Sequence, residues 1–218
     1  MLFHFLEVNQ TAKKIYQPSR KSRKNTARPV VIIVCDGTRT EPIYFKNFEN
    51  RERPLHVKVV PGGKNYLELI KKGISVKGNL ESECSVWCVT DVDADPSTPG
   101  NITARNTQLK EFAEKAKENG FRIALSNPCF ELWFLLHFTY THGSMLNYDA
   151  VKQRLIKHIP DYKKNDDYFD LLVNMQESAI SNAKALAQHH TMQGVNDFIN
   201  VSVNPYTGVH ELIESIRS

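Results

Sequence analysis

The chain has 218 residues, 41% of them hydrophobic, which is enough for one sizeable domain or for a domain with an appendage, with a buried core. No run of the sequence approaches the roughly 18 consecutive apolar residues of a membrane span, so we expect no transmembrane segment. The four cysteines lack CxxC spacing, which favours buried thiols of a cytoplasmic protein over a disulfide set or a zinc site.

The net charge of +4 is concentrated at the start of the chain. Residues 1–28 contain seven Lys and Arg residues and a single acid, so the remainder is slightly acidic. A flexible basic tail of this kind suits nucleic-acid phosphates, and the candidate contacts are Arg20, Lys21, Arg23 and Lys24. A disordered N-terminus that only aids solubility explains the same charges.

From residue 29 the sequence alternates between strand and helix patterns. Val30–Cys35 is an apolar, β-branched run typical of a strand buried on both faces. Further strands are expected at 55–60, 85–90 and 121–125, and helices at 41–50, 66–76, 104–119 and 129–138, the last with Asn127 as N-cap and Pro128 in its first turn. This rhythm predicts an α/β fold, Rossmann-like, with a mostly parallel four-stranded sheet and flanking helices.

The alternation fades after residue 140. Helical spacing returns at 149–158 and 167–190, whereas 195–203 fits either a short strand or a loop. A final helix is expected after Asn204-Pro205. We therefore expect an α/β core at 29–138 and a mainly helical C-terminal region at 139–218 packed on that core.

Carboxylates follow two of the expected strands. Asp36 ends the first strand and precedes Gly37, and Asp91 and Asp93 end the third. The carboxyl ends of parallel strands meet at one edge of a sheet, where open α/β sheets place their sites. Clustered carboxylates need a cation, and Mg²⁺ prefers carboxylate oxygens. An Asp-rich turn without a metal accounts for the Asp91–Asp93 triplet alone.

Two glutamates extend this set. Glu41 opens the helix after Asp36, where it either complements the helix dipole, with Thr40 as cap, or acts as a ligand or general base. Glu131 stands alone in an apolar helix and must be paired, protonated or bound, with backbone amides as the simplest partners. His137 in the same helix is interpreted as a hydrogen-bonded core histidine.

Four segments together resemble the RloB-like proteins, over about residues 21–218. They read IVCDGTRTEPIYF (33–45), WCVTDVD (87–93), SNPCFELWFLLHF (126–138) and NPYTGVHEL (204–212). The resemblance implies a bacterial protein of phage defence, often encoded beside an ATPase partner. It also implies a Toprim-like fold, in which an acid after the first strand and an Asp-x-Asp after a later strand hold Mg²⁺ or Mn²⁺ for phosphodiester chemistry.

Matched to this chain, the resemblance makes Asp36, Asp91 and Asp93 the metal ligands and Glu41 the second acid of the first loop. Lys164, in a Tyr-x-Lys that recurs in the family, is the candidate cation for the developing charge, although a solvated loop explains it too. One departure is Asp36, where the family usually carries Glu, so that its carboxylate reaches about 1.5 Å less far.

The leading hypothesis is a metal-dependent Toprim-type nuclease acting on DNA or RNA. Its catalytic residues would be Asp36, Glu41, Glu131 and Lys164, and Arg39 would join the tail in binding nucleic acid. The alternative is a weakly active or inactive module that works through the ATPase partner, and a nucleotidyl-transferring enzyme is a third option. A homodimer stays open.

Overall fold

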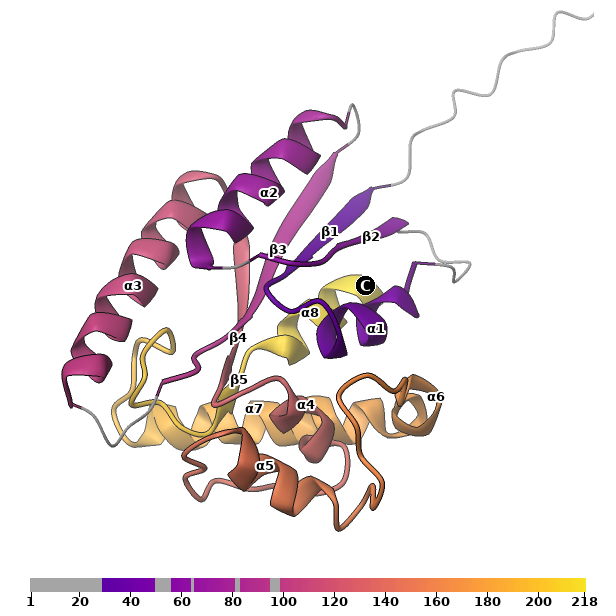
Figure 1. Cartoon of the computed structure of the whole chain (residues 1–218), viewed down its shortest axis with the longest axis vertical. Coiled ribbons are helices and arrows are strands. Elements are labelled where there is room, and N and C mark those ends of the chain that lie inside the picture. Colours follow the sequence, from indigo (N-terminus) through magenta and orange to yellow (C-terminus); the bar gives the residue numbers. More distant parts are fainter. Residues whose placement is uncertain (1–28, 50–55, 64, 81–82, 95–98) are drawn as a thin grey trace, which may run out of the picture.

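The computed structural model describes residues 29–49, 56–63, 65–80, 83–94 and 99–218. These residues form a five-stranded sheet of order β2-β1-β3-β4-β5, in which the first four strands pair in parallel and β5 runs antiparallel to β4 (Figure 1). The strands are β1 (Val30–Cys35), β2 (His56–Val60), β3 (Cys84–Asp91), β4 (Arg122–Asn127) and β5 (Tyr206–Thr207). The predicted α/β class is confirmed.

Helices cover both faces of the sheet, and a further group lies beyond the carboxyl ends of the parallel strands (Figure 1). The helices are α1 (Thr40–Lys46), α2 (Tyr66–Gly78), α3 (Pro99–Glu118), α4 (Glu131–Leu136), α5 (Tyr148–Leu155), α6 (Phe169–Leu172), the 3₁₀ turn η1 (Val173–Met175), α7 (Gln176–Met192) and α8 (Val209–Arg217). In Figure 1, α2 and α3 lie on one side of the sheet, and α1 and α8 on the other.

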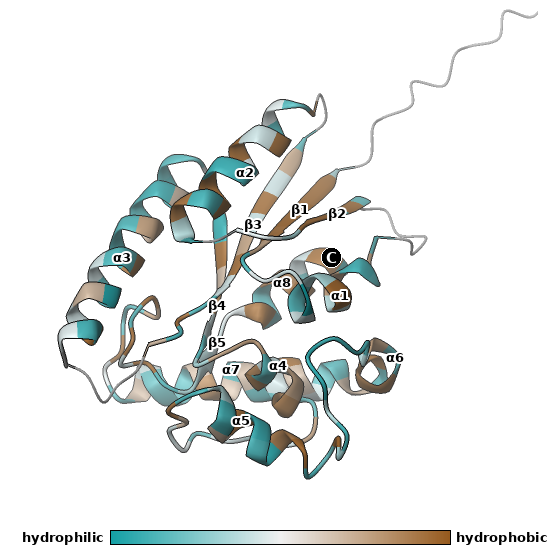
Figure 2. Cartoon of the chain, in the orientation of Figure 1, coloured by the Kyte–Doolittle hydropathy of each residue, from teal (hydrophilic) through white to brown (hydrophobic). Residues whose placement is uncertain are grey.

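β1 contributes side chains to two hydrophobic cores. All six of its residues are buried, as predicted for a central strand. Val31 and Ile33 pack on the face covered by α1, α4, α7 and α8, whereas Ile32 and Val34 pack on the face covered by α2 and α3. Figure 2 shows the hydrophobic residues running along β1 and β3. Because side chains alternate along a strand, β1 packs into both cores, and Asp36 follows directly after this buried segment.

The sheet differs from the prediction in having a fifth strand. Tyr206–Thr207 pairs with β4 through Thr207 opposite Ser126, and the two hydroxyls lie 3.0 Å apart. A two-residue strand is too short to produce a period in the sequence. The region 139–218, expected to be mainly helical, therefore adds an edge strand to the sheet and places α8 on one of its faces.

Asn127 was predicted to cap a helix, and this prediction is wrong. It is the last residue of β4, and its amide donates to the carbonyls of Val201 and Val203 at 2.9 and 2.8 Å. α4 begins four residues later and is shorter than the expected 129–138. The expected helix at 167–190 is also divided, into α6, η1 and α7.

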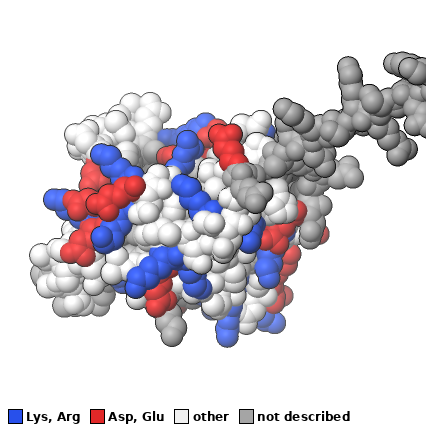
Figure 3. Space-filling view, turned by 90° about the horizontal axis from the view of Figure 1, so that it is seen from above, with Lys and Arg blue, Asp and Glu red and all other residues white. Residues whose placement is uncertain are grey.

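Two surface properties bear on function. Within the described residues no helix combines the length and the apolar character needed to cross a membrane. On the face seen in Figure 3, the Lys and Arg side chains of the described residues are interspersed with Asp and Glu. The basic tail at 1–28, with its four candidate contacts, lies outside the described residues.

Candidate active site

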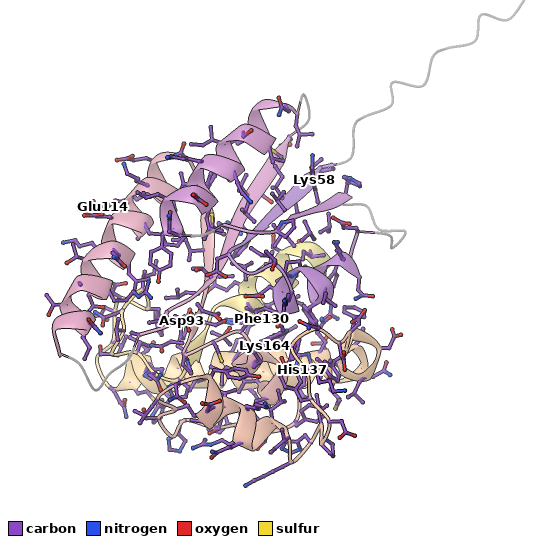
Figure 4. The ribbon with its side chains drawn as sticks, viewed as in Figure 1. Lys58, Asp93, Glu114, Phe130, His137 and Lys164 are labelled. Carbon is purple, nitrogen blue, oxygen red and sulfur yellow. The ribbon has the colours of Figure 1, made fainter. Side chains whose placement is uncertain are left out.

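Asp36, Glu41, Asp91 and Asp93 line one pocket of about 940 Å³ at the carboxyl ends of β1 and β3, whereas Glu131 is not among its lining residues. Figure 4 shows Asp93 and Lys164 near the ends of these strands, well away from Lys58 at the sheet edge. The wall and floor residues with carboxyl groups are Asp36, Glu41, Asp91, Asp93 and Glu111. The topology thus brings together acids separated by more than fifty positions in the sequence.

Asp36 is tied to the neighbouring strand. Its carboxylate accepts hydrogen bonds from the hydroxyl of Thr90 and, at 3.3 Å, from the backbone amide of Asp91. Burial raises the pKa of Asp36, and the Thr90 hydrogen bond offsets part of that rise. The side chain is therefore oriented before any ligand arrives.

Asp91 combines a buried oxygen that lacks a hydrogen-bond partner among the described residues with a raised pKa. Its Oδ1 atom is buried and has no hydrogen-bond partner among the described residues. Burial raises the pKa of Asp91 well above its ordinary value, and the charges of Glu41 and Asp36 raise it further. A buried oxygen without a partner is costly, and a bound cation would remove that cost.

Glu41 lies in the first turn of α1 but points into the pocket. It is 7% exposed, and burial, followed by the charge of Asp36, raises its pKa to about 7. Its carboxylate lies over Gly37, since a Cβ on that glycine would stand 2.9 Å from the Glu41 carboxyl carbon. Thr40, considered as a cap, is instead the first helical residue, and its hydroxyl donates to the carbonyl of Lys164 at 3.0 Å. Because Glu41 is buried, it differs from an exposed acid whose only role is to complement the helix dipole.

Asp93 lies beyond the end of β3, so the strand alternation that was expected to align it with Asp91 does not reach it. It is exposed, has a positive φ of 46°, and its carbonyl accepts a hydrogen bond from Arg105 at 3.0 Å. Among the described residues, no three His, Cys, Asp or Glu side chains are gathered closely enough to hold a metal as they stand. The acids thus share a pocket without forming a closed ligand set.

The donor chemistry nevertheless fits a hard cation. Mg²⁺ and Mn²⁺ take carboxylate oxygens, and Asp36 and Asp91 supply them from adjacent strand ends. The unpartnered Oδ1 of Asp91 and the raised pKa values of Asp36, Glu41 and Asp91, which come from burial and then from neighbouring acids, are both relieved by positive charge. The residues present are therefore compatible with a divalent metal.

Glu131 is held by side chains rather than by the backbone amides that seemed simplest. It is 2% exposed, its Oε1 accepts a hydrogen bond from the Tyr162 hydroxyl at 3.0 Å, and Lys164 Nζ lies 3.8 Å from the same oxygen. Lys164 Nζ also lies 3.8 Å from the centroid of the Tyr148 ring. Burial is the largest influence and lowers the pKa of Lys164, but Glu131, followed by Tyr148, Cys129 and Asp91, together raise it by more, so the net shift is upward. These contacts hold Lys164 at the pocket in its charged form.

Basic and aromatic side chains complete the walls. Arg39 is exposed at the mouth, beside the Asp36 turn, and Arg105 lines the opposite wall together with Tyr66. Sequence reasoning missed Arg105, Tyr66 and Tyr148, because nothing in their helices distinguishes them from ordinary surface residues.

His137 is a core histidine as predicted, with Nδ1 2.9 Å from the Trp133 carbonyl and its pKa lowered by burial to about 4.

Comparisons with known proteins give one family. The family model for RloB-like proteins matches residues 31–216. None of the curated proteins that were compared matches the sequence. One solved structure, of a "putative acylhydrolase" from Bacteroides fragilis NCTC 9343, covers 94% of this chain and 88% of its own, at 13% identity and a TM-score of 0.29. That likeness is too low to carry an argument about activity. The family match spans nearly the whole chain, and the protein belongs to the RloB-like family.

Proposed function

We propose that the protein is a Mg²⁺-dependent nuclease of Toprim type that hydrolyses phosphodiesters of DNA or RNA. The observation that carries the proposal is the buried, unpartnered Oδ1 of Asp91 beside Asp36 and Glu41 in one pocket. The order of the acids, one after the first strand and an Asp-x-Asp after the third, agrees with the Toprim resemblance.

Asp36, Asp91 and Asp93 would hold the metal. When bound, Mg²⁺ would stabilise negative charge on the phosphoryl oxygens and lower the pKa of a coordinated water. Asp36 is suited to this role because the Thr90 hydroxyl and the Asp91 amide fix its carboxylate while leaving one oxygen free of these two bonds.

Glu41 would accept the proton of the attacking water at its carboxylate. A pKa of about 7 lets the group be ionised in part near neutral pH and still hold a proton well, which is what general-base catalysis requires. Lys164 would contact a phosphate oxygen, and the ion pair with Glu131 would hold the Lys164 ammonium group in position. Arg39 and the basic tail would bind the nucleic acid away from the reacting phosphate.

The second candidate is a binding module without strong catalysis that acts through an ATPase partner in phage defence. The observation that favours it is Asp36, whose side chain is one methylene shorter than the family pattern. The two candidates share a setting, since the resemblance associates either with a bacterial defence system.

The test is cleavage of plasmid DNA and of transfer RNA with Mg²⁺, Mn²⁺ or EDTA. Wild type should nick or cut in the presence of metal, and Asp91→Asn should lose at least about 100-fold. Asp170→Asn is the matched control, because Asp170 is exposed on α6 and lies outside the pocket lining. Absence of metal-dependent cleavage by wild type, also with the partner ATPase supplied, would refute the nuclease and leave the binding module. Equal cleavage by wild type and Asp91→Asn would refute the metal-binding role of Asp91.

A further inference from the structure

The wall of the pocket formed by α2 and α3 presents an arginine that the metal chemistry does not use. Arg105 lines the pocket, and its guanidinium donates to the Asp93 carbonyl at 3.0 Å and approaches Gln108 Oε1 at 3.4 Å. Among the described residues, no carboxylate lies within ion-pair distance of Arg105. No ion pair within this part of the chain therefore occupies its charge, although five acidic residues line the same pocket.

An aromatic platform holds this guanidinium in place. Arg105 Cζ lies 5.5 Å from the centroid of the Tyr66 ring, and Tyr66 in turn stacks on Phe112 with centroids 5.0 Å apart. The Tyr66 hydroxyl donates to the Asp91 carbonyl at 3.1 Å. The platform is thus fixed to the end of β3, so that Arg105 loses little conformational entropy when it binds a ligand.

We infer that Arg105, supported by Tyr66, is a phosphate-binding subsite for the phosphodiester that neighbours the reacting one. The inference rests on the proposed nuclease, whose acids would hold the reacting phosphate through metal. A guanidinium has five N–H donors in a planar fork, and the two bonds to Asp93 and Gln108 leave others to meet phosphate oxygens. Asn65 and Gln108 on the same wall add neutral polar groups.

The arrangement gives the pocket a direction. Arg39 lies in the β1–α1 turn, Asp36 and Asp91 lie at the strand ends, and Arg105 lies on α3, which also carries Glu111 into the pocket lining. A nucleic-acid strand that spans the pocket would meet a cation on either side of the acidic centre. A single phosphate monoester would need only one of these cations, so the subsite selects for a polymer rather than a mononucleotide.

The test is fluorescence anisotropy with a labelled 12-nucleotide single strand, as DNA and as RNA, in Ca²⁺ and in EDTA over a salt series. Arg105→Ala should weaken binding by about 10-fold and make the salt slope shallower by about one. Arg105→Lys should recover part of the affinity, because the charge remains and the fork is lost. Arg122→Ala is the matched control, since Arg122 also packs over an aromatic ring, Trp87 at 5.3 Å, and does not line the pocket. It should bind within about twofold of wild type, as expected where no phosphate contact is lost.

The inference is overturned if Arg105→Ala binds like wild type, if Arg122→Ala loses as much, or if wild type shows no salt-dependent binding. Calorimetry with Mn²⁺ distinguishes phosphate binding by Arg105 from a purely structural role. Arg105→Ala should keep the metal affinity of wild type. A loss equal to that of Asp91→Asn would mean that Arg105 acts only by holding the Asp93 carbonyl. A wild type that binds the strand through Arg105 but cleaves nothing would refute the nuclease alone. Normal binding and cleavage by Arg105→Ala would refute the subsite alone.

Discussion

The carboxylate of Asp36 accepts a hydrogen bond from the backbone amide of Asp91 at 3.3 Å, which links the ends of β1 and β3 through a side chain. The Asp91 amide lowers the pKa of Asp36, and the charge of Asp36 raises the pKa of Asp91. The link means that a change at Asp36 acts on Asp91, and that charge and hydrogen bonding at this position have to be tested separately.

Asparagine and glutamate at position 36 separate those two roles. Asp36→Asn keeps an acceptor oxygen for Thr90 and Asp91 but removes the charge, so cleavage should fall by about 100-fold or more while the fold persists. Asp36→Glu restores the family's length and should cleave at least as fast as wild type. Plasmid nicking rates measure both. Full activity of Asp36→Asn would exclude a ligand role for this carboxylate.

Glu41 should make the metal-free protein less stable as the pH rises. Its pKa is about 7 when folded and near 4.5 when unfolded, so the folded state holds the proton more tightly. This contribution to stability is complete below pH 4.5 and lost as the pH rises through 7, a change on the order of 3 kcal/mol. Urea unfolding in EDTA between pH 5 and 8 should show a flatter profile for Glu41→Gln. Parallel profiles for the two proteins would contradict the assigned pKa.

Gly37 should be required for the position of Glu41. Gly37→Ala places a methyl group where the Glu41 carboxylate lies, and this flexible side chain can move away without unfolding α1. Cleavage should drop by about 100-fold, the usual scale of a lost general base, with a loss of stability below about 1 kcal/mol. Gly100→Ala is the control, because a methyl group there meets open space. Equal activity of Gly37→Ala and Gly100→Ala would argue against Glu41 as the base.

Lys164 and Glu131 form an ion pair, and substitutions of the two residues should reduce cleavage by different amounts. Lys164→Met removes a cation whose side chain is 48% exposed, so cleavage should fall by about 100-fold with little change in stability. Glu131→Gln keeps the acceptor for Tyr162 but frees Lys164, and we expect a loss of cleavage of about 10-fold, smaller than that of Lys164→Met.

Lys163→Met controls for a general loss of charge, since Lys163 is exposed and lies outside the pocket lining. Single-turnover cleavage and urea unfolding are the two measurements. If Lys163→Met lost as much activity as Lys164→Met, the pairing with Glu131 would have no specific role.

The sequence reveals those parts of the site that depend on local patterns. The β-branched run at Val30–Cys35 predicts a buried strand, and its end places Asp36 correctly. The same argument places Asp91 at the end of β3. Adjacency of β1 and β3 follows from strand order, which a parallel fold makes reasonable but which the sequence alone does not determine.

Other features depend on contacts between distant segments. Asn127 has the residue type and position of a helix cap, yet a loop seventy-odd residues later uses its amide and keeps it in β4. Tyr148 meets Lys164 only because α5 folds back beneath the pocket, and Arg105 is one charge among many on α3. Such partners have no sequence period, so only the folded chain reveals them.

Calorimetric titration with Mn²⁺ tests the central claim most directly, because it measures metal binding without any assumption about the substrate. Wild type and Asp170→Asn should bind the metal alike, and Asp91→Asn should lose the binding, since Oδ1 of Asp91 is the buried acceptor that a cation would satisfy. Equal binding by wild type and Asp91→Asn, or no binding by wild type, would contradict a metal site formed by these strand-end carboxylates.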